Sequence, residues 1–233
     1  MKILVLILAS DSAPEYIEFQ SIWKMYMNLH PKIDCYFYKG DPTLPTEAVL
    51  RGNTLLLRIE ESLDTVYEKT LRAFRFFEPQ LSDYTFVYRT NLSSFIDFGK
   101  YLQVCASLPK TECCAAFVGT DDDGVPFPSG AGFTLSPDLV RRLLRENPPL
   151  LVQDDITIGH ALHQWGIPIV PVNRADYVAE ENVFIFKCFD LEMPTFHYRV
   201  KSDDRNLDVI ALRTLVTRNH PSEWLWEGLR NML

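Results

Sequence analysis

Short runs of branched apolar residues alternate with amphipathic stretches along most of this 233-residue chain, and this alternation restricts the fold more than any other feature. The first run, residues 3–8, is Ile-Leu-Val-Leu-Ile-Leu and is typical of a strand buried on both faces of a parallel sheet. A polar turn, Ser-Asp-Ser-Ala-Pro, comes next, and residues 15–28 then carry apolar residues at helical spacing. This order predicts an α/β fold with ligands at the carboxyl ends of the strands.

The alternation continues to about residue 172 and then becomes less regular. Further strands are predicted at 33–38, 54–59, 84–88, 114–118, 133–135, 167–172 and 183–189, with an extended segment at 196–201. Further helices are predicted at 64–77, 95–108, 137–145, 155–165 and 206–218. A long polar loop is expected at 119–130, and loops of that length are often functional. The length and the 47% hydrophobic content suit one large domain.

Charge and cysteine content exclude several classes of protein. The 23 basic and 31 acidic residues give a net charge of -8, which disfavours a broad nucleic-acid surface, so any phosphate site must be local. The five cysteines are odd in number and form no Cys-x-x-Cys pair, which favours a reducing compartment. The apolar runs are too short to cross a bilayer. We expect a soluble, cytoplasmic protein of bacterial or viral type, of open oligomeric state.

Two motifs in the second half of the chain resemble those of a known enzyme family. Residues 127–136 read Phe-Pro-Ser-Gly-Ala-Gly-Phe-Thr-Leu-Ser, and residues 154–159 read Asp-Asp-Ile-Thr-Ile-Gly. Their order and separation resemble those of the β-1,3-glycosyltransferases of the galactosyltransferase and fringe type, which carry Tyr-Pro-x-x-x-Gly-x-Gly-Tyr-x-Leu-Ser and then Glu-Asp-Val-x-x-Gly. Residues 64–71 and Trp23 are similar to weaker family features. The resemblance covers roughly residues 1 to 200.

This resemblance implies a single GT-A (Rossmann-like) domain with a mixed, mostly parallel sheet flanked by helices. Residues 1–110 would form the nucleotide-sugar-binding part, and 111–233 the acceptor and catalytic part. The implied activity is that of an inverting hexosyl- or N-acetylhexosaminyltransferase. Such an enzyme moves a sugar from a nucleotide diphospho-sugar, with uridine as the implied base, to a hydroxyl group of a glycan or other acceptor.

The motif match gives Asp155 the role of general base, which takes the proton from the acceptor hydroxyl as that oxygen attacks the sugar. A second interpretation is that Asp154 and Asp155 cap a helix, and this fits Asp154 better. On the acceptor side the match also places Asp154, Ser129, Gly130 and Gly132. The glycines would allow a close approach of the backbone to substrate, or simply a tight turn.

The expected donor site contains an informative departure from the family. Residues 89–95 read Arg-Thr-Asn-Leu-Ser-Ser-Phe where the family has Lys-Thr-Asp-Asp-Asp-x-Phe, so Asn91 and Ser93 replace metal-binding aspartates. Neutral oxygens hold a divalent cation poorly, so manganese or magnesium dependence is open and binding without metal is an alternative. Asn91 and Ser93 would still contact the donor. The base and ribose are expected at Ser10, Asp11 and Ser12, where a plain turn is the alternative.

Cations near the donor could replace the metal. We interpret Arg89, His197, Arg199 and Lys201 as a diphosphate-binding group, because the last three share one face of an extended segment. A solvated strand face explains the same alternation, and His197 also matches a metal-holding histidine of the family. The run Asp121-Asp122-Asp123 before Gly124 is interpreted as a solvated turn rather than a displaced metal site.

Two other classes of function remain open from the sequence. One is a catalytically silent module that binds a nucleotide-sugar. The other is a nucleotidyltransferase, although no Gly-rich phosphate loop with a following Lys comes after the first strand. Four aromatic residues could stack on a sugar or belong to the core or an interface: Phe127, Trp165, Trp224 and Trp226.

Overall fold

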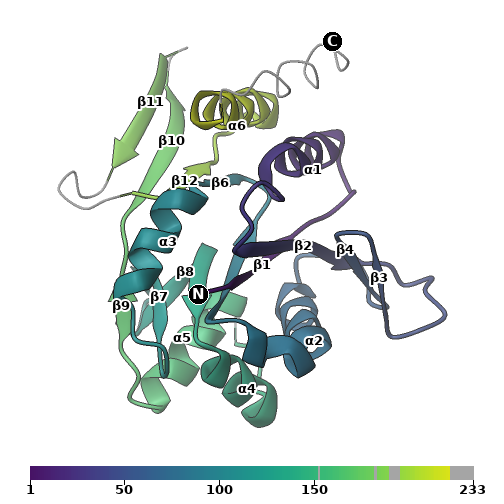
Figure 1. Ribbon diagram of the computed structural model, residues 1–233, viewed down its shortest axis with the longest axis vertical. Coiled ribbons are helices and arrows are strands. Elements are labelled where there is room, and N and C mark those ends of the chain that lie inside the picture. Colours follow the sequence, from purple (N-terminus) through teal and green to yellow (C-terminus); the bar gives the residue numbers. More distant parts are fainter. Residues whose placement is uncertain (152, 181–182, 189–194, 221–233) are drawn as a thin grey trace.

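The computed structural model describes residues 1–151, 153–180, 183–188 and 195–220 (Figure 1). A large sheet has the strand order β3-β4-β2-β1-β5-β8-β7-β9. Its strands are β1 (Ile3–Leu8), β2 (Ile33–Gly40), β3 (Ala48–Arg51), β4 (Thr54–Leu57), β5 (Phe86–Asn91), β7 (Cys114–Thr120), β8 (Pro126–Leu135) and β9 (Ile169–Pro171). The pairs β4-β2, β2-β1, β1-β5 and β7-β9 are parallel, whereas β3 and β8 run antiparallel to their neighbours. The sheet is therefore mixed, as predicted.

Helices cover both faces of this sheet. They are α1 (Pro14–Tyr26), α2 (Val66–Phe77), α3 (Phe98–Ser107), α4 (Pro137–Glu146), α5 (Asp154–Gln164) and α6 (Arg205–Asn219), with a 3-10 helix at Glu78–Asp83. Figure 1 shows α6 lying beside α1. No helix in the described ranges is long and apolar enough to span a membrane.

The alternation of side chains along β1 creates two separate cores. Ile3, Val5 and Ile7 belong to a cluster with α1, α3 and α6, while Leu4 and Leu6 belong to a cluster with α2, α4 and α5. Successive side chains on a strand point to opposite faces, so a central strand covered on both sides must be apolar throughout. This explains why the first run of the sequence contains no polar residue. The free cysteines Cys35, Cys105, Cys113 and Cys114 are buried in the two cores.

A second, four-stranded sheet was not predicted. Its order is β11-β10-β12-β6, with β11 at Val183–Cys188, β10 at Arg174–Glu180, β12 at His197–Val200 and β6 at Ser94–Ile96. Strand β6 occupies the start of the region where we expected a helix, so α3 begins only at Phe98. Strand β12 confirms the extended segment predicted at 196–201. It pairs antiparallel with β6 and places Arg199 opposite Ser94.

The region expected to be a long loop at 119–130 is mostly a β-hairpin. Strand β7 runs to Thr120 and β8 begins at Pro126, so only a short turn remains between them. The pairing of the two strands shifts register, because Ala116 opposes Phe133 but Val118 opposes Pro128. Phe117 alone therefore faces residues 129–132, which form an irregular bulge in β8. A bulge bends its strand and changes the direction of the side chains and backbone groups within it. This bulge contains Ser129 and Gly130.

Candidate active site

Two adjoining cavities open at the carboxyl ends of β1 and β5. The first measures about 690 Å³ and the second about 450 Å³, and they share a wall formed by Leu8, Leu63, Val66 and Asn91. The predicted residues that line the first cavity are Arg89, Asn91, Ser129, Gly130, Asp154, Asp155, Arg199 and Lys201. Those that line the second are Ser10, Ser12, Asn91 and Ser93. Within the described part of the chain, Asp11, Gly132 and His197 line neither cavity.

Asp155 lies in the first turn of α5, with its carboxylate in the first cavity. Its Oδ2 accepts a hydrogen bond from the backbone N–H of Gly130 at 2.8 Å, and its Oδ1 accepts one from the N–H of Ile156 at 3.0 Å. Partial burial raises the pKa of Asp155, and the negative charge of Asp154 raises it further, against the opposing effect of the two N–H donors and Arg89. A carboxylate with a raised pKa is a stronger base than an ordinary aspartate.

Asp154 and Arg89 form a buried ion pair beside this carboxylate. The guanidinium Nη2 lies 2.7 Å from Asp154 Oδ2, and Arg89 is only 2% exposed. The same guanidinium donates to the carbonyl oxygen of Gly130 and, from Nε, to the hydroxyl of Tyr38 at 3.2 Å. Burial lowers the pKa of Arg89, but Asp154 and Tyr38 raise it above its ordinary value. The donors of Arg89 thus already have partners, and contact with a diphosphate stays a prediction.

The start of α5 bears on the helix-capping interpretation of the acidic pair, and Asp155 does accept a hydrogen bond from a first-turn N–H, that of Ile156. The N-cap of α5 is Gln153, and neither aspartate occupies that position. The helix start is instead held by Thr157, whose hydroxyl donates to the carbonyl of Gln153 at 2.7 Å and accepts from the N–H of Leu151 at 3.0 Å. Asp154 is thus held by the Arg89 ion pair, and Asp155 faces the cavity.

Two glycines allow α5 and β8 to come close enough for this arrangement. A Cβ atom on Gly130 would lie 2.8 Å from Asp155 Oδ2, and one on Gly159 would lie 2.5 Å from the Cβ of Phe127. Both distances are too short for any other residue, because a Cβ cannot approach a carboxylate oxygen or a strand so closely. The glycine that ends the second motif therefore packs the helix against the hairpin. The sequence offered a signal for Gly159 only through the motif itself.

His197 and Gly132 lie deeper than predicted. The His197 ring is 2% exposed and lies between the hydroxyls of Tyr88, at 3.3 Å from Nδ1, and Ser94, at 3.0 Å from Nε2. Burial lowers the pKa of His197 well below its ordinary value, and the charges of Arg174 and Arg199 lower it further. A Cβ on Gly132 would lie 2.3 Å from the Tyr88 hydroxyl, so this glycine makes room for the buried tyrosine.

The segment that replaces the acidic triplet is held in place by neutral groups. Asn91 Oδ1 accepts from the hydroxyls of Ser93 at 3.1 Å and Ser94 at 3.2 Å, and Leu92 is buried in the core at 5% exposure. The indole N–H of Trp23 donates to the carbonyl of Leu92 at 3.0 Å. The segment offers no carboxylate, and among the described residues no three His, Cys, Asp or Glu side chains are grouped to hold a metal ion. These residues do not fit the metal site that the resemblance implies.

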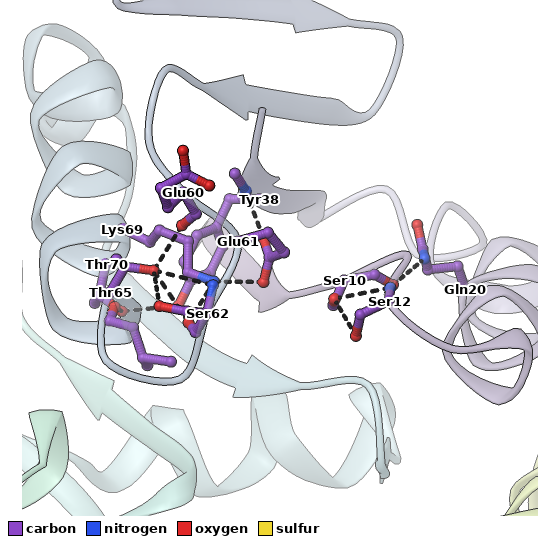
Figure 2. Close-up of polar contacts among 12 residues, drawn as sticks. Ser10, Ser12, Gln20, Tyr38, Glu60, Glu61, Ser62, Thr65, Lys69 and Thr70 are labelled. Carbon is purple, nitrogen blue, oxygen red and sulfur yellow. Dashed lines mark hydrogen bonds and ion pairs between the residues drawn. The ribbon is translucent and has the colours of Figure 1, made fainter. Parts of the chain in front are cut away.

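The turn after β1 forms one side of the second cavity. The Ser10 and Ser12 hydroxyls are 2.9 Å apart, and Gln20 holds the turn by donating to the Ser10 carbonyl and to Asp11 Oδ1, both at 2.9 Å. Figure 2 shows the two serines and Gln20 linked in this way. Asp11 points to Lys39, whose Nζ lies 2.5 Å from Oδ2. The serine hydroxyls face the cavity, whereas the carboxylate of Asp11 is engaged in an ion pair.

A buried lysine on the opposite side of this cavity was not predicted as a site residue. Lys69 is 1% exposed, and its Nζ lies 2.5 Å from Glu61 Oε1 and 3.2 Å from the carbonyl of Ser62 (Figure 2). Glu61 Oε2 in turn accepts from the N–H of Gly40 at 2.6 Å. Glu61, Ser62 and Lys69 all line the second cavity. Lys69 falls in the weak match at 64–71, which was the only sequence signal for it.

The acidic run at 121–123 forms a turn, as interpreted from the sequence. Asp121 Oδ1 accepts from the N–H groups of Asp123 at 3.0 Å and Val125 at 2.8 Å, and Oδ2 lies 2.6 Å from Nε2 of His160. The bond with His160 and the two N–H donors lower the pKa of Asp121. Because His160 belongs to α5, this pair ties the hairpin tip to the helix that carries Asp155.

The four aromatic candidates have different surroundings. Phe127 lines the first cavity, while Trp165 packs beneath the guanidinium of Arg142 at 4.3 Å from ring centroid to Cζ. Trp224 and Trp226 lie outside the described residues. Phe127 is therefore the one of these four that the described structure places at a cavity wall.

Comparisons with known proteins bear on the fold. No protein-family model matches the chain, and no curated protein matches it. Among solved structures, a glycosyltransferase involved in the glycosylation of the major capsid of PBCV-1 is similar, with a TM-score of 0.54, 8% identity, and coverage of 92% of this chain and 100% of that one. A 4-diphosphocytidyl-2C-methyl-D-erythritol synthase from Anaerococcus prevotii DSM 20548 has a TM-score of 0.47, 12% identity, and coverage of 93% and 96%. The chain has the mixed α/β fold of a GT-A, Rossmann-like domain, which confirms the predicted fold class.

Proposed function

We propose that this chain is an inverting glycosyltransferase that uses a nucleotide diphospho-sugar and transfers its sugar to a hydroxyl group. The observation that most supports this proposal is the position of Asp155. Its carboxylate faces the larger cavity and accepts a hydrogen bond from the Gly130 N–H at 2.8 Å. Its raised pKa suits a group that must accept a proton. The shared fold supports the proposal, because a glycosyltransferase is built on the same architecture.

The two cavities fit the two parts of such a reaction. The smaller one, with Ser10 and Ser12, would take the nucleoside, and the larger one would take the sugar and the acceptor. The acceptor hydroxyl loses its proton to Asp155 while its oxygen forms a bond to the anomeric carbon. The bond from that carbon to the diphosphate oxygen breaks on the opposite face, and its electron pair leaves with the nucleotide. A uridine base is what the sequence resemblance implies for the donor.

A screen of nucleotide-sugars for release of the nucleoside diphosphate tests this proposal. Uridine, guanosine, cytidine and thymidine diphospho-sugars are each incubated with a panel of hydroxyl acceptors, and Asp155→Asn is run beside the native chain. We expect one donor to be consumed by the native chain, with a rate roughly 10²- to 10⁴-fold lower for the variant. Equal rates for the two proteins would remove Asp155 from the mechanism. A parallel incubation of each nucleoside triphosphate with a sugar 1-phosphate tests the nucleotidyltransferase alternative, which would release pyrophosphate as it forms the nucleotide-sugar.

A catalytically silent nucleotide-sugar-binding module is a second candidate. The neutral segment Asn91-Leu92-Ser93 favours it, because metal-assisted departure of the diphosphate has no carboxylate to depend on there. If the chain is such a module, the native chain and Asp155→Asn should both bind the nucleotide, and neither should transfer the sugar.

A further inference from the structure

We infer that the donor diphosphate is bound by Arg199, Lys201 and Arg205 in place of a divalent metal ion. This inference rests on the proposed function, because it concerns the leaving group of the same reaction. Its residues differ from those of the sequence interpretation. Arg89 is 2% exposed and bonded to Asp154, Gly130 and Tyr38, and His197 lies between two hydroxyls, so neither is included. Arg205 is added because it lines the second cavity with 32% of its side chain exposed, although one of its nitrogens is paired with Asp208. Arg199, Lys201 and Arg205 are called the cation cluster below.

The first observation is where strand β12 ends. The backbone N–H of Val200 donates to the carbonyl of Ser93 at 2.8 Å, and Arg199 pairs with Ser94 in the ladder. Arg199 and Lys201 thus stand on either side of a residue bonded directly to the segment that has lost its carboxylates. Their side chains share one face of the extended chain, and both line the first cavity.

The second observation is the state of Arg199. Its side chain is partly buried, and among the described residues none accepts a hydrogen bond from its Nε. Burial lowers the pKa of Arg199, and the positive charges of Arg174 and Arg205 lower it further, although Asp176 and Asp155 act in the opposite direction. An arginine stays protonated at neutral pH even so. A buried donor without a partner is costly, and an anionic oxygen at the cavity wall would satisfy it.

The third observation is that Arg205 extends the positive charge into the second cavity. Arg205 lines that cavity, together with Ser10, Ser12 and Ser93. Its Nη1 lies 2.6 Å from Asp208 Oδ2, and its guanidinium lies 5.8 Å from the ring centroid of Tyr16, so the side chain is positioned before any ligand arrives. The cation cluster therefore has members in both cavities, which adjoin at Asn91, and a diphosphate that joined a nucleoside in the second cavity to a sugar in the first would pass between them.

This placement suits the chemistry of the leaving group. Negative charge grows on the diphosphate as its oxygen separates from the anomeric carbon, and fixed cations stabilise that charge most when it is fully developed. Guanidinium groups can donate two parallel hydrogen bonds to a phosphate, which orients it as well as neutralising it. Arg199 and Arg205 would orient the diphosphate, while the exposed Lys201 would add charge.

Calorimetric titration with uridine, guanosine, cytidine and thymidine diphosphate, each with EDTA and again with manganese, tests the cation cluster. We expect one of the four to bind in EDTA with an affinity that manganese leaves within a factor of two. Arg199→Gln should weaken binding roughly 10- to 100-fold, because it removes a charge-assisted hydrogen bond. Lys201→Gln should weaken it by less, since this side chain is exposed.

The matched control is Lys32→Gln, an exposed lysine at the amino end of β2 and therefore at the opposite edge of the sheet. It removes the same charge and should leave the affinity unchanged. Arg199→Lys keeps the charge and should recover part of the lost affinity. Thermal unfolding of every variant shows that the protein is folded. The corresponding nucleosides, which lack phosphate, should bind the native chain and Arg199→Gln equally.

The outcomes separate this inference from the proposed function. Binding that requires manganese and is unaffected by Arg199→Gln would overturn the cation cluster and leave the transferase standing. Binding in EDTA that none of the substitutions weakens would also overturn it. No binding of any nucleoside diphosphate in either condition would overturn both proposals.

Discussion

The backbone N–H of Gly130 donates a hydrogen bond of 2.8 Å to the carboxylate of Asp155, across the interface between β8 and α5. A Cβ at position 130 would lie 2.8 Å from the same oxygen, so Gly130→Ala must displace the carboxylate. We expect a roughly 10²-fold lower kcat with nucleotide affinity retained, because a catalytic group misplaced by about 1 Å loses much of its effect. Gly99→Ala is the control, since its Cβ would only touch Asp97 at 3.4 Å. Full activity of Gly130→Ala would show that this hydrogen bond does not position Asp155.

Substitution of Asp155 by Asn should separate stability from activity. The folded-state pKa of Asp155 is raised, so the folded protein holds this proton more tightly than the unfolded chain, and stability falls as pH rises from the ordinary aspartate value through the raised one. This loss of stability persists at neutral pH. Asp155→Asn loses one of the two N–H acceptors along with the charge, so the stability of the native chain relative to this variant should fall as pH rises through that range, while the variant loses transfer. Asp123→Asn, at an exposed position of the hairpin turn, should change neither quantity. A stability difference between the native chain and Asp155→Asn that stays constant with pH would contradict the assignment of its charge as unfavourable.

The pH dependence of transfer should report the charge of Asp154. In the proposed mechanism transfer needs an ionised Asp155, so kcat/KM should fall as pH drops through a pKa above the ordinary aspartate value. Asp154→Asn removes a like charge and leaves Arg89 unpaired, and both changes should move this acidic limb to lower pH. The same substitution should destabilise the fold by about 3 kcal/mol, because a buried guanidinium loses its partner. A pH–rate profile measured well below the unfolding temperature decides the point. If the acidic limb lies at the same pH in Asp154→Asn as in the native chain, a group other than Asp155 titrates there.

Lys69 and Glu61 should behave as one unit in a double-mutant cycle. Lys69→Met leaves a carboxylate in a partly buried position, so we expect a loss of about 2 to 3 kcal/mol in the free energy of unfolding. Glu61→Gln alone leaves the buried ammonium without its counter-charge and should cost a similar amount. The double variant should lose less than the sum of the two, with a coupling of roughly 1 to 3 kcal/mol from urea denaturation. Strict additivity would show that the short contact contributes nothing to stability.

The first half of the fold was predictable from sequence because its pattern is local. A central strand such as β1 must be apolar on both faces, and the helix that follows it shows its buried stripe within a dozen residues. The second sheet was missed because β6 has three residues and pairs with β12, about a hundred residues later. β6 is too short to show a period of its own, and the alternation at 197–201 does not indicate which strand it pairs with. Only the folded chain brings them together.

The candidate site was predictable in its residue types but not in their partners. The alternation of His197, Arg199 and Lys201 correctly placed them on one face of a strand, yet the strand runs from the interior to a cavity wall, so only its later residues reach the cavity. Likewise, the carboxyl end of β5 predicted Arg89 at the site. No local pattern could reveal that its guanidinium is paired with Asp154, 65 residues away in sequence.

The bulge at 129–132 has a consequence for how this protein could change over time. It separates an inner part of the hairpin, whose register with β5 is fixed, from an outer tip at residues 121–125. Insertions or deletions in the tip would leave the register of the inner part unchanged, because the bulge interrupts the ladder, but any that remove Asp121 would also break its contact with His160 of α5. The length of the tip can therefore vary without displacing Asp155 only where the Asp121–His160 contact, which holds the hairpin to the helix that carries Asp155, is kept.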